Sequence, residues 1–388
     1  MELSVGIAAQ EDRVRGEGQR VLLPVLVDGK WGYIDRTGEV VFKVSCDGAW
    51  GFSEGMAVIA VQGKAGYING QGDVVVEPRF ESACEFHEGR ARVGLPDGEL
   101  KIGEEVFPVS RYGFINKTGD MVILPAFLDT RNFSEGLAAV AVGGKWVERE
   151  EHIGDEVFPY PQIEGAKWGF VDKDGKFVIA AQFEAARDFS QGLAPVKREG
   201  KWGYVDKEGK VIVAPQFAYT LGFSEGLAAV NLGGEEAGGE ICVGGKWGFI
   251  DRSGKMAIPT QYVEVGSFHE DLAAVKMQGT ERWTEGYIDK GGKVAIKPSF
   301  FEVSGFSEGL ARVRARHPRT GLMRYGYIDK TGEYVIEPQF MLASNFSKGV
   351  AAVSLDYPEP GKEYTQGYID RTGRFIWSVR RKAPPVPE

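Results

Sequence analysis

The octapeptide FSEGLAAV stands at residues 133–140 and is repeated without change at residues 223–230. Six near copies begin at other phenylalanines of the chain, which are Phe52, Phe86, Phe189, Phe268, Phe306 and Phe346. Successive copies are 34, 47, 56, 34, 45, 38 and 40 residues apart. Self-similarity at such a period indicates a repeat protein, in which 34 residues form the bare unit and the extra residues form loops on one face.

A second motif alternates with the octapeptide, and its copy at residues 201–217 reads KWGYVDKEGKVIVAPQF. Side chains alternate along KWGYV, which predicts a strand. Asp and Gly then predict a turn into a second strand that ends near a proline. With the LAAV segment as a third strand, each unit is predicted to contain three antiparallel strands. The nine copies begin at Lys30, Lys64, Arg111, Lys167, Lys201, Lys246, Thr284, Arg324 and Gln366.

The two motifs together predict an all-β protein, a tandem array of about nine three-stranded units that spans residues 21–379 as one domain. Residues 1–20 are predicted to be a poorly ordered N-terminal segment, and residues 380–388 a basic and proline-rich tail. Propellers typically have four to eight blades of four strands. Nine three-stranded units with unequal insertions therefore favour an open superhelical array, similar to a solenoid, over a closed propeller-like ring.

The alternation of KWGYID and FSEGLA resembles the bacterial WG-repeat (KWG-repeat) family over nearly the whole chain. The resemblance implies all-β repeat modules that bind or scaffold, and it brings no catalytic residue to this chain. The tryptophan of the motif is replaced in five copies, by Ala65, Tyr112, Glu285, Tyr325 and Gln366. A ligand site that needs every tryptophan is therefore not expected.

Composition limits the partners and the compartment. The net charge of −9 and the pI near 5.3 argue against nucleic acid and favour a basic protein partner. Three widely spaced cysteines, Cys46, Cys84 and Cys242, indicate neither a disulfide framework nor a metal site. The simplest location is the cytoplasm, and an exported form whose signal has been removed is the alternative. No stretch is long and apolar enough to predict a membrane span or a signal peptide.

The repeated residues offer little catalytic chemistry. Tryptophans such as Trp202 could form a row of stacking platforms for carbohydrate or could pack between units, and packing is favoured. The glutamate of the octapeptide is interpreted as a solvated turn residue, because Gln191 and Lys348 replace it in two copies. The run from Asp172 to Gly175 resembles the start of a calcium loop but lacks its later ligands. We therefore predict no enzyme, no catalytic residue, no cofactor and no metal.

Two insertions in consecutive units share a phrase, KIGEEVFPVS from Lys101 and HIGDEVFPYP from His152. Each combines acidic residues with a phenylalanine before proline, a mixture common at protein interfaces. We predict a non-enzymatic scaffold whose twin insertions project side by side and bind a protein partner. A carbohydrate-binding module that uses the aromatic row is the first alternative, and an enzyme of unknown type ranks third. The predicted binding residues are Glu104, Glu105, Phe107, Trp146, Asp155, Glu156, Phe158 and Tyr160.

Overall fold

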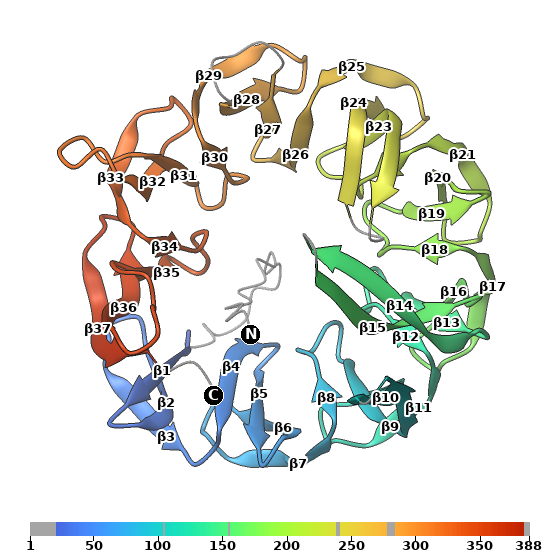
Figure 1. Ribbon diagram of the computed structural model, residues 1–388, viewed down its shortest axis with the longest axis horizontal. Helices are drawn as coiled ribbons and strands as arrows, with labels where there is room; N and C mark the ends of the chain where they lie inside the picture. Colours follow the sequence, from blue (N-terminus) through green and yellow to red (C-terminus); the bar gives the residue numbers. More distant parts are fainter. Residues whose placement is uncertain (1–20, 104, 154–155, 238–240, 278–283, 384–388) are drawn as a thin grey trace. The chain divides into compact units, whose positions relative to one another are not determined.

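The computed structural model describes residues 21–103, 105–153, 156–237, 241–277 and 284–383. The regular secondary structure in these ranges consists of β-strands alone, which confirms the all-β prediction (Figure 1). The described residues contain no helix that could cross a membrane. The predicted N-terminal segment, 1–20, lies outside these ranges. The predicted tail begins later than expected, because the last strand continues to Lys382.

Each repeat forms one antiparallel sheet, which we call a blade and number along the chain. Blade 1 contains β1 (Leu23–Val27), β2 (Lys30–Ile34) and β3 (Val40–Val44), and blade 2 contains β4 (Gly48–Ser53), β5 (Met56–Val61), β6 (Lys64–Asn69) and β7 (Val74–Phe80). Blade 3 contains β8 (Ser82–Ala83), β9 (Ala91–Ile102), β10 (Glu105–Ile115) and β11 (Met121–Phe127), and blade 4 contains β12 (Asp129–Thr130), β13 (Ala138–Val142), β16 (Lys167–Val171) and β17 (Phe177–Phe183). Blade 5 contains β18 (Ala185–Ala186), β19 (Ala194–Arg198), β20 (Lys201–Val205) and β21 (Val211–Phe217). A separate hairpin, β14 (Lys145–Ile153) and β15 (Glu156–Glu164), lies between β13 and β16 in the chain.

The later repeats follow the same pattern. Blade 6 contains β22 (Tyr219–Thr220), β23 (Leu227–Ala237), β24 (Ile241–Asp251) and β25 (Met256–Tyr262), and blade 7 contains β26 (Glu264–His269), β27 (Leu272–Lys276), β28 (Glu285–Asp289) and β29 (Val294–Phe300). Blade 8 contains β30 (Glu302–Val303), β31 (Ala311–Arg316), β32 (Met323–Ile328) and β33 (Tyr334–Phe340). Blade 9 contains β34 (Leu342–Ala343), β35 (Val350–Ser354), β36 (Glu363–Asp370) and β37 (Phe375–Lys382).

The described residues form two compact units. One comprises Leu22–Ile34 and Val40–Gln216, and therefore most of blades 1 to 5. The other comprises Val21, Asp35–Glu39 and the described residues from Phe217 onward, and therefore blades 6 to 9.

The predicted three-stranded unit is wrong, because blades 2 to 9 each have four strands in the part of the chain that is described. The missed strand is the first of each blade, which runs beside the octapeptide strand. It is often only two residues long, as in β12 and β18, where Ala186 pairs with Val196. Two residues are too few for a period-two pattern to be visible in the sequence.

The predicted open superhelical array is also wrong. Gly38, in the turn of the first blade, lies so close to the last blade that an added Cβ would be 2.0 Å from the carbonyl oxygen of Ile376. Both residues belong to the same compact unit. The ends of an open array would be apart, so this contact and the four-stranded blades favour the propeller alternative.

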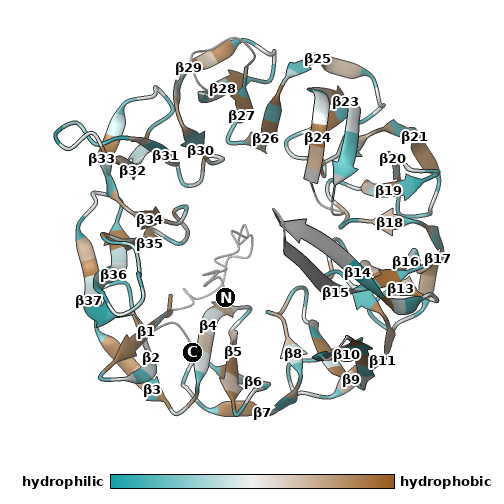
Figure 2. Ribbon diagram, in the orientation of Figure 1, coloured by the Kyte–Doolittle hydropathy of each residue, from teal (hydrophilic) through white to brown (hydrophobic). Residues whose placement is uncertain are grey.

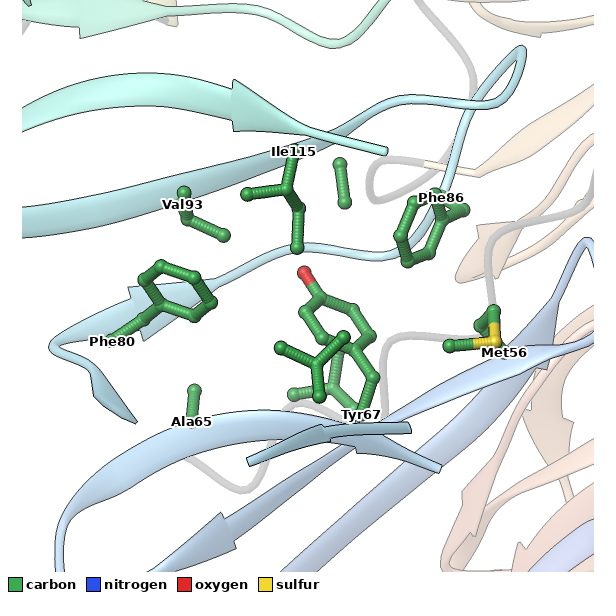
Figure 3. Packing of buried hydrophobic residues seen from close by; sticks show 10 residues of the cluster. Met56, Ala65, Tyr67, Phe80, Phe86, Val93 and Ile115 are labelled. Atoms are coloured by element: carbon green, nitrogen blue, oxygen red, sulfur yellow. The ribbon is translucent and has the colours of Figure 1, made fainter. Parts of the chain in front are cut away.

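Within each compact unit, a repeated aromatic pair joins consecutive blades. The aromatic residue after WG packs on the phenylalanine of the next octapeptide, with ring centroids 5.0 Å apart for Tyr67 and Phe86 (Figure 3). The Tyr67 hydroxyl also donates a hydrogen bond of 2.7 Å to the carbonyl oxygen of Cys84. Apolar residues along middle strands such as β5 and β13 supply the rest of the core (Figure 2). The two motifs recur together because each contact between blades needs one residue from each.

Candidate functional site

The predicted twin insertions form two hairpins that are longer than the blades require. The bare repeat in blade 5 turns at Glu199 and Gly200, whereas β9 and β10 continue their pairing to Ile102 and Glu105. The second hairpin, β14–β15, is paired from Lys145 with Glu164 to Ile153 with Glu156. Strand β9 begins in the body of blade 3 and continues into the first hairpin. It contacts both β14 and β15, so the second hairpin lies against the strand that leads into the first.

The first hairpin has an inner and an outer face. Leu100 pairs with Phe107, and both are half-buried, while Ile102 on the same face is buried. Cross-strand partners share one face of a hairpin, so the opposite face carries Lys101 and Val106. Val106 is 52% exposed. The apolar inner face therefore supports the hairpin, and the outer face is available to a partner.

The second hairpin also has one open face. Tyr160 is 37% exposed and pairs with Arg149 across the strands. Arg149 donates a hydrogen bond of 3.1 Å to the side-chain oxygen of Gln162 and forms an ion pair with Glu164. Trp146 is half-buried, and its indole Nε1 is inaccessible and has no hydrogen-bond partner among the described residues. Tyr160 thus lies on a polar, solvated ladder, and Trp146 belongs to the hairpin's packing.

The remaining predicted binding residues are placed only in part. Glu105 is exposed at the end of β10. Glu104 and Asp155 lie outside the described residues, and so do the side chains of Glu156 and Phe158, whose backbones are in β15. The structure therefore places Glu105, Val106 and Phe107 on the first hairpin and Trp146 and Tyr160 on the second. Val106 was not among the predicted residues, and its place in the shared phrase EVFP was the signal for it.

The tryptophans of the repeats do not form a row of open platforms. Trp202 is 2% exposed and Trp247 is also buried, while Trp31 and Trp168 are half-buried. The guanidinium carbon of Arg187 lies 4.9 Å from the centre of the Trp202 ring and covers one face of it. Packing within the blade accounts for these buried tryptophans, since Tyr219 of the same blade likewise packs on Trp247, with ring centroids 6.0 Å apart.

The octapeptide glutamate is more than the solvated turn residue that was predicted. The Glu135 carboxylate accepts a hydrogen bond of 2.9 Å from the backbone N–H of Gly192 in the next octapeptide. It also forms an ion pair of 3.2 Å with Lys207 of the next blade. The same bond to the following turn is made by Glu54, Glu88, Glu225, Glu270 and Glu308. The repeated glutamate is thus a clamp between blades.

A group of charged residues on blades 3 to 5 was missed by the sequence analysis. Asp188, after the first strand of blade 5, is exposed on one side and surrounded by protein on the others. Partial desolvation raises the pKa of its carboxyl above the ordinary value, although the charges of Arg131, His87, Arg187 and Arg92 oppose this shift. Arg131 and Arg187 stand immediately before Asn-Phe and Asp-Phe at the start of two octapeptides, and that shared position was the available signal.

The rest of the site chemistry is limited. The described residues contain no group of three or more His, Cys, Asp or Glu side chains able to hold a metal ion. The run at Asp172, which resembles a calcium loop, is a turn in which the Asp172 carboxylate accepts hydrogen bonds from the backbone N–H groups of Asp174 and Lys176. That carboxylate is therefore engaged by its own backbone, as in an Asx turn.

Solved structures and a repeat-family model resemble this chain in its fold and in its repeats. A crystal structure described as the eukaryotic initiation factor is similar to this chain, with 10% identity, coverage of 94% of this chain and 97% of that chain, and a TM-score of 0.58. A quinonprotein alcohol dehydrogenase-like protein from Bacteroides thetaiotaomicron is 9% identical over 79% of this chain and 84% of that chain, with a TM-score of 0.35. At these identities the first likeness shows the fold alone, and the second carries no argument.

No curated protein matches the chain. The family model for the WG containing repeat matches residues 31–64, 66–95, 112–146, 168–202, 202–235, 247–280, 286–315 and 325–357. These segments make up well over half of the sequence. Each begins in the WG strand of one blade and ends in or just after the octapeptide strand of the next blade. The chain therefore belongs to the WG containing repeat family.

Proposed function

We propose that this protein is a non-enzymatic binding protein and that its two long hairpins, β9–β10 and β14–β15, hold a basic segment of a protein partner. The observation that supports the proposal is the contact of strand β9 with both strands of the second hairpin, together with the exposure of Val106 and Tyr160. The bare turn of blade 5 shows that a blade forms without such an extension. The hairpins are therefore additions to the repeat, and loops held by a rigid scaffold often carry binding.

Charge and apolar contact have separate roles in this proposal. Glu99, Glu105 and Glu148 are exposed on the two hairpins. Such carboxylates attract a basic partner and speed its association, mainly at low salt. Val106 and Tyr160 then provide apolar anchors, since aromatic and apolar residues at the centre of an interface supply most of its affinity.

The test replaces residues 96–110 and 143–166 with the Glu-Gly turn of blade 5, at the positions that correspond to the Arg198–Lys201 pair. Binding is measured by fluorescence polarisation with a panel of peptides that combine lysine or arginine with apolar residues. We expect wild-type protein to bind some of these peptides, with affinity that falls as salt rises, and the trimmed protein to lose this binding.

The matched control trims residues 233–245 of the β23–β24 hairpin to the same Glu-Gly turn. That hairpin also extends beyond a blade and exposes Val243, but it belongs to the other compact unit. The control should bind as the wild type does. Equal binding by all three proteins, or binding of acidic peptides instead, would contradict the proposal.

A further inference from the structure

Two neighbouring strands of blade 8 are basic, although the chain as a whole is acidic. Between Leu310 and Ile328 the sequence has five arginines and no aspartate or glutamate, whereas the whole chain has a net charge of −9. This segment contains β31, β32 and the turn between them, which is longer than the two-residue turn of blade 5. Like charges that lie close together destabilise a sheet, so the fold alone does not explain this concentration of arginine.

One of these arginines has a structural role. The Nη1 of Arg312 donates a hydrogen bond of 2.7 Å to the carbonyl oxygen of Ala343 in blade 9, and its Nη2 donates one of 2.9 Å to Glu302. Arg92 has the same place in the octapeptide of blade 3 and likewise donates to the carbonyl oxygen of Thr130 in the next blade. Arg312 is therefore part of the contact between blades.

Arg314 lacks the carboxylate that its position has in blade 7. There the equivalent residue, Lys276, pairs across the strands with Glu264, whose two carboxylate oxygens each lie 3.2 Å from the lysine Nζ. In blade 8 the equivalent glutamate, Glu302, pairs with Arg314 in the same register. Its carboxylate is held instead by the structural arginine and by the Tyr325 hydroxyl, at 2.7 Å. Within the described part of the chain, no carboxylate forms an ion pair with Arg314.

Arg314 and Arg316 share one face of β31 with two aromatic rings, because alternate residues of a strand point the same way. The guanidinium carbon of Arg314 lies 5.7 Å from the centre of the Tyr325 ring, and that of Arg316 lies 5.8 Å from the centre of the Phe301 ring. Arg316 is exposed and donates a hydrogen bond of 3.1 Å to the carbonyl oxygen of Gly321. Phe301 is 40% exposed. We call these four residues, Phe301, Arg314, Arg316 and Tyr325, the arginine face.

The arginine face combines the two kinds of contact that an acidic peptide needs. An arginine that packs on an aromatic ring is already ordered, and its remaining N–H groups can bind a carboxylate with little further loss of entropy. The exposed Phe301 ring offers an apolar anchor beside them. Nucleic acid would need a wider positive surface, which the net charge of the chain opposes.

We propose that the arginine face of blade 8 is a second interaction surface, which binds an acidic segment of a protein partner with an apolar side chain next to aspartate or glutamate. This face belongs to a different compact unit from the two long hairpins of blades 3 and 4, and its partner has the opposite charge. The inference therefore does not depend on the function proposed for those hairpins.

The test measures fluorescence polarisation of labelled peptides that combine aspartate or glutamate with leucine or phenylalanine, beside counterparts with lysine in place of the acidic residues. The wild-type protein should bind the acidic peptides with affinity that falls as salt rises. Arg314→Gln with Arg316→Gln should weaken this binding about tenfold or more, because charge-assisted hydrogen bonds are lost. Phe301→Ala should weaken it several-fold without changing its dependence on salt.

The matched control is Lys197→Gln with Arg198→Gln, which removes two positive charges from the corresponding strand of blade 5. Lys197 is equivalent to Arg314, and Arg198 also lies over an aromatic ring, that of Phe183, at 5.4 Å. This control should bind the acidic peptides as the wild type does. The protein trimmed of both long hairpins should also bind them unchanged, so failure of this proposal can be distinguished from failure of the proposed function.

Several results would overturn the proposal. One is an equal loss of binding in the control, which would show that only net charge matters. Others are acidic peptides that bind no more tightly than their lysine counterparts, loss of acidic-peptide binding in the trimmed protein, or tighter binding of a single-stranded oligonucleotide at the same arginines. If the double arginine variant fails to fold, Arg316→Glu takes its place, because Arg316 is exposed. It should remove the preference for acidic peptides, and an unchanged preference would equally overturn the proposal.

Discussion

At the residue scale, the motif tryptophan acts through burial. Trp202 is 2% exposed and lies between the Arg187 side chain and its own blade. Blades 3 and 8 replace this tryptophan with Tyr112 and Tyr325, and in both an octapeptide arginine covers the ring, Arg92 at 5.1 Å and Arg312 at 4.8 Å. Each tyrosine that replaces the tryptophan is thus covered by an arginine side chain, as expected if this position serves packing rather than ligand binding.

We predict that Trp202→Ala lowers the free energy of unfolding by about 3–5 kcal/mol, because it removes a large buried side chain and leaves a cavity. The measurement is urea denaturation followed by circular dichroism. Trp50→Ala is the control, since Trp50 is 45% exposed; it should cost less than about 1 kcal/mol, as for most surface substitutions. Similar losses for both variants would show that burial is not the cause.

A second prediction concerns Glu285, which replaces the tryptophan in blade 7. Its carboxylate accepts a hydrogen bond of 2.9 Å from the Val303 N–H. Burial raises the pKa of the Glu285 carboxyl above 4.5. The negative charges of Glu264 and Glu302 raise this pKa further, whereas the positive charge of Lys276 opposes the rise. The folded state therefore favours the protonated Glu285 carboxyl. As the pH rises from 4.5 through the pKa of the folded state, the carboxyl ionises and the free energy of unfolding of the protein falls. Glu285→Gln, whose amide oxygen can accept the same bond, should melt above wild type at pH 8, with a smaller difference at pH 4.

Glu225 supplies a control of opposite sign. Burial alone would raise its pKa, but the hydrogen bonds from Lys290 and from the backbone of Asp271 lower it overall. Its stabilising effect is therefore present above the unfolded pKa and is lost as the pH falls through the folded value. Glu225→Gln should melt below wild type at pH 8 and approach it at low pH. The same sign of change in both variants would contradict these assignments.

At the element scale, the octapeptide turn explains why glutamate and glycine stand together. Glu135 and Gly136 have φ angles of 54° and 89°, so both are left-handed, as in a two-residue hairpin of type I′. This conformation directs the carboxylate at the following turn, where it meets Gly192 and Lys207. A left-handed glutamate is strained, and its bonds to the next blade offset that strain.

We predict that Glu135→Ala costs about 1–3 kcal/mol, because it leaves a backbone N–H and a lysine without their acceptor. Glu208→Ala is the control, since Glu208 is exposed in a neighbouring turn. Amide hydrogen exchange should show faster exchange at Gly192 in the first variant only. Unchanged exchange at Gly192 would mean that the clamp does not hold the next turn.

The sequence predicted the elements that have a strong local signal. The hairpin in KWGYVDKEGKVIV and the paired insertions could be predicted because alternation and Asp-Gly turns are visible over ten or more residues. The two-residue strand at Ala185 has no such signal, and its pairing with Lys197 depends on the rest of the blade. The clamp at Glu135 and the charges around Asp188 were missed for a related reason, since their partners lie on other repeats.

At the scale of the whole molecule, the contact between the first and last repeats is the feature that the repeat pattern could not supply. Within each compact unit, consecutive blades are joined by the same aromatic pair, as for Tyr327 and Phe346 at 4.8 Å. Such a rule describes only adjacent repeats, so it is compatible with open and closed arrangements alike. The turn at Asp35–Glu39, which belongs to the same compact unit as the last blade, distinguishes them.

The last prediction isolates that contact with two glycines of similar backbone. Gly38 and Gly29 have φ angles of 86° and 74°, so alanine at either is strained by about 1–2 kcal/mol. A Cβ at Gly29 meets nothing within 4 Å, whereas at Gly38 it would lie 2.0 Å from the Ile376 oxygen. Gly38→Ala should therefore lower the free energy of unfolding by about 1–3 kcal/mol more than Gly29→Ala does, as overpacking typically costs. Urea denaturation of the two variants measures this difference. Equal losses would mean that Gly38 does not meet the last blade in solution.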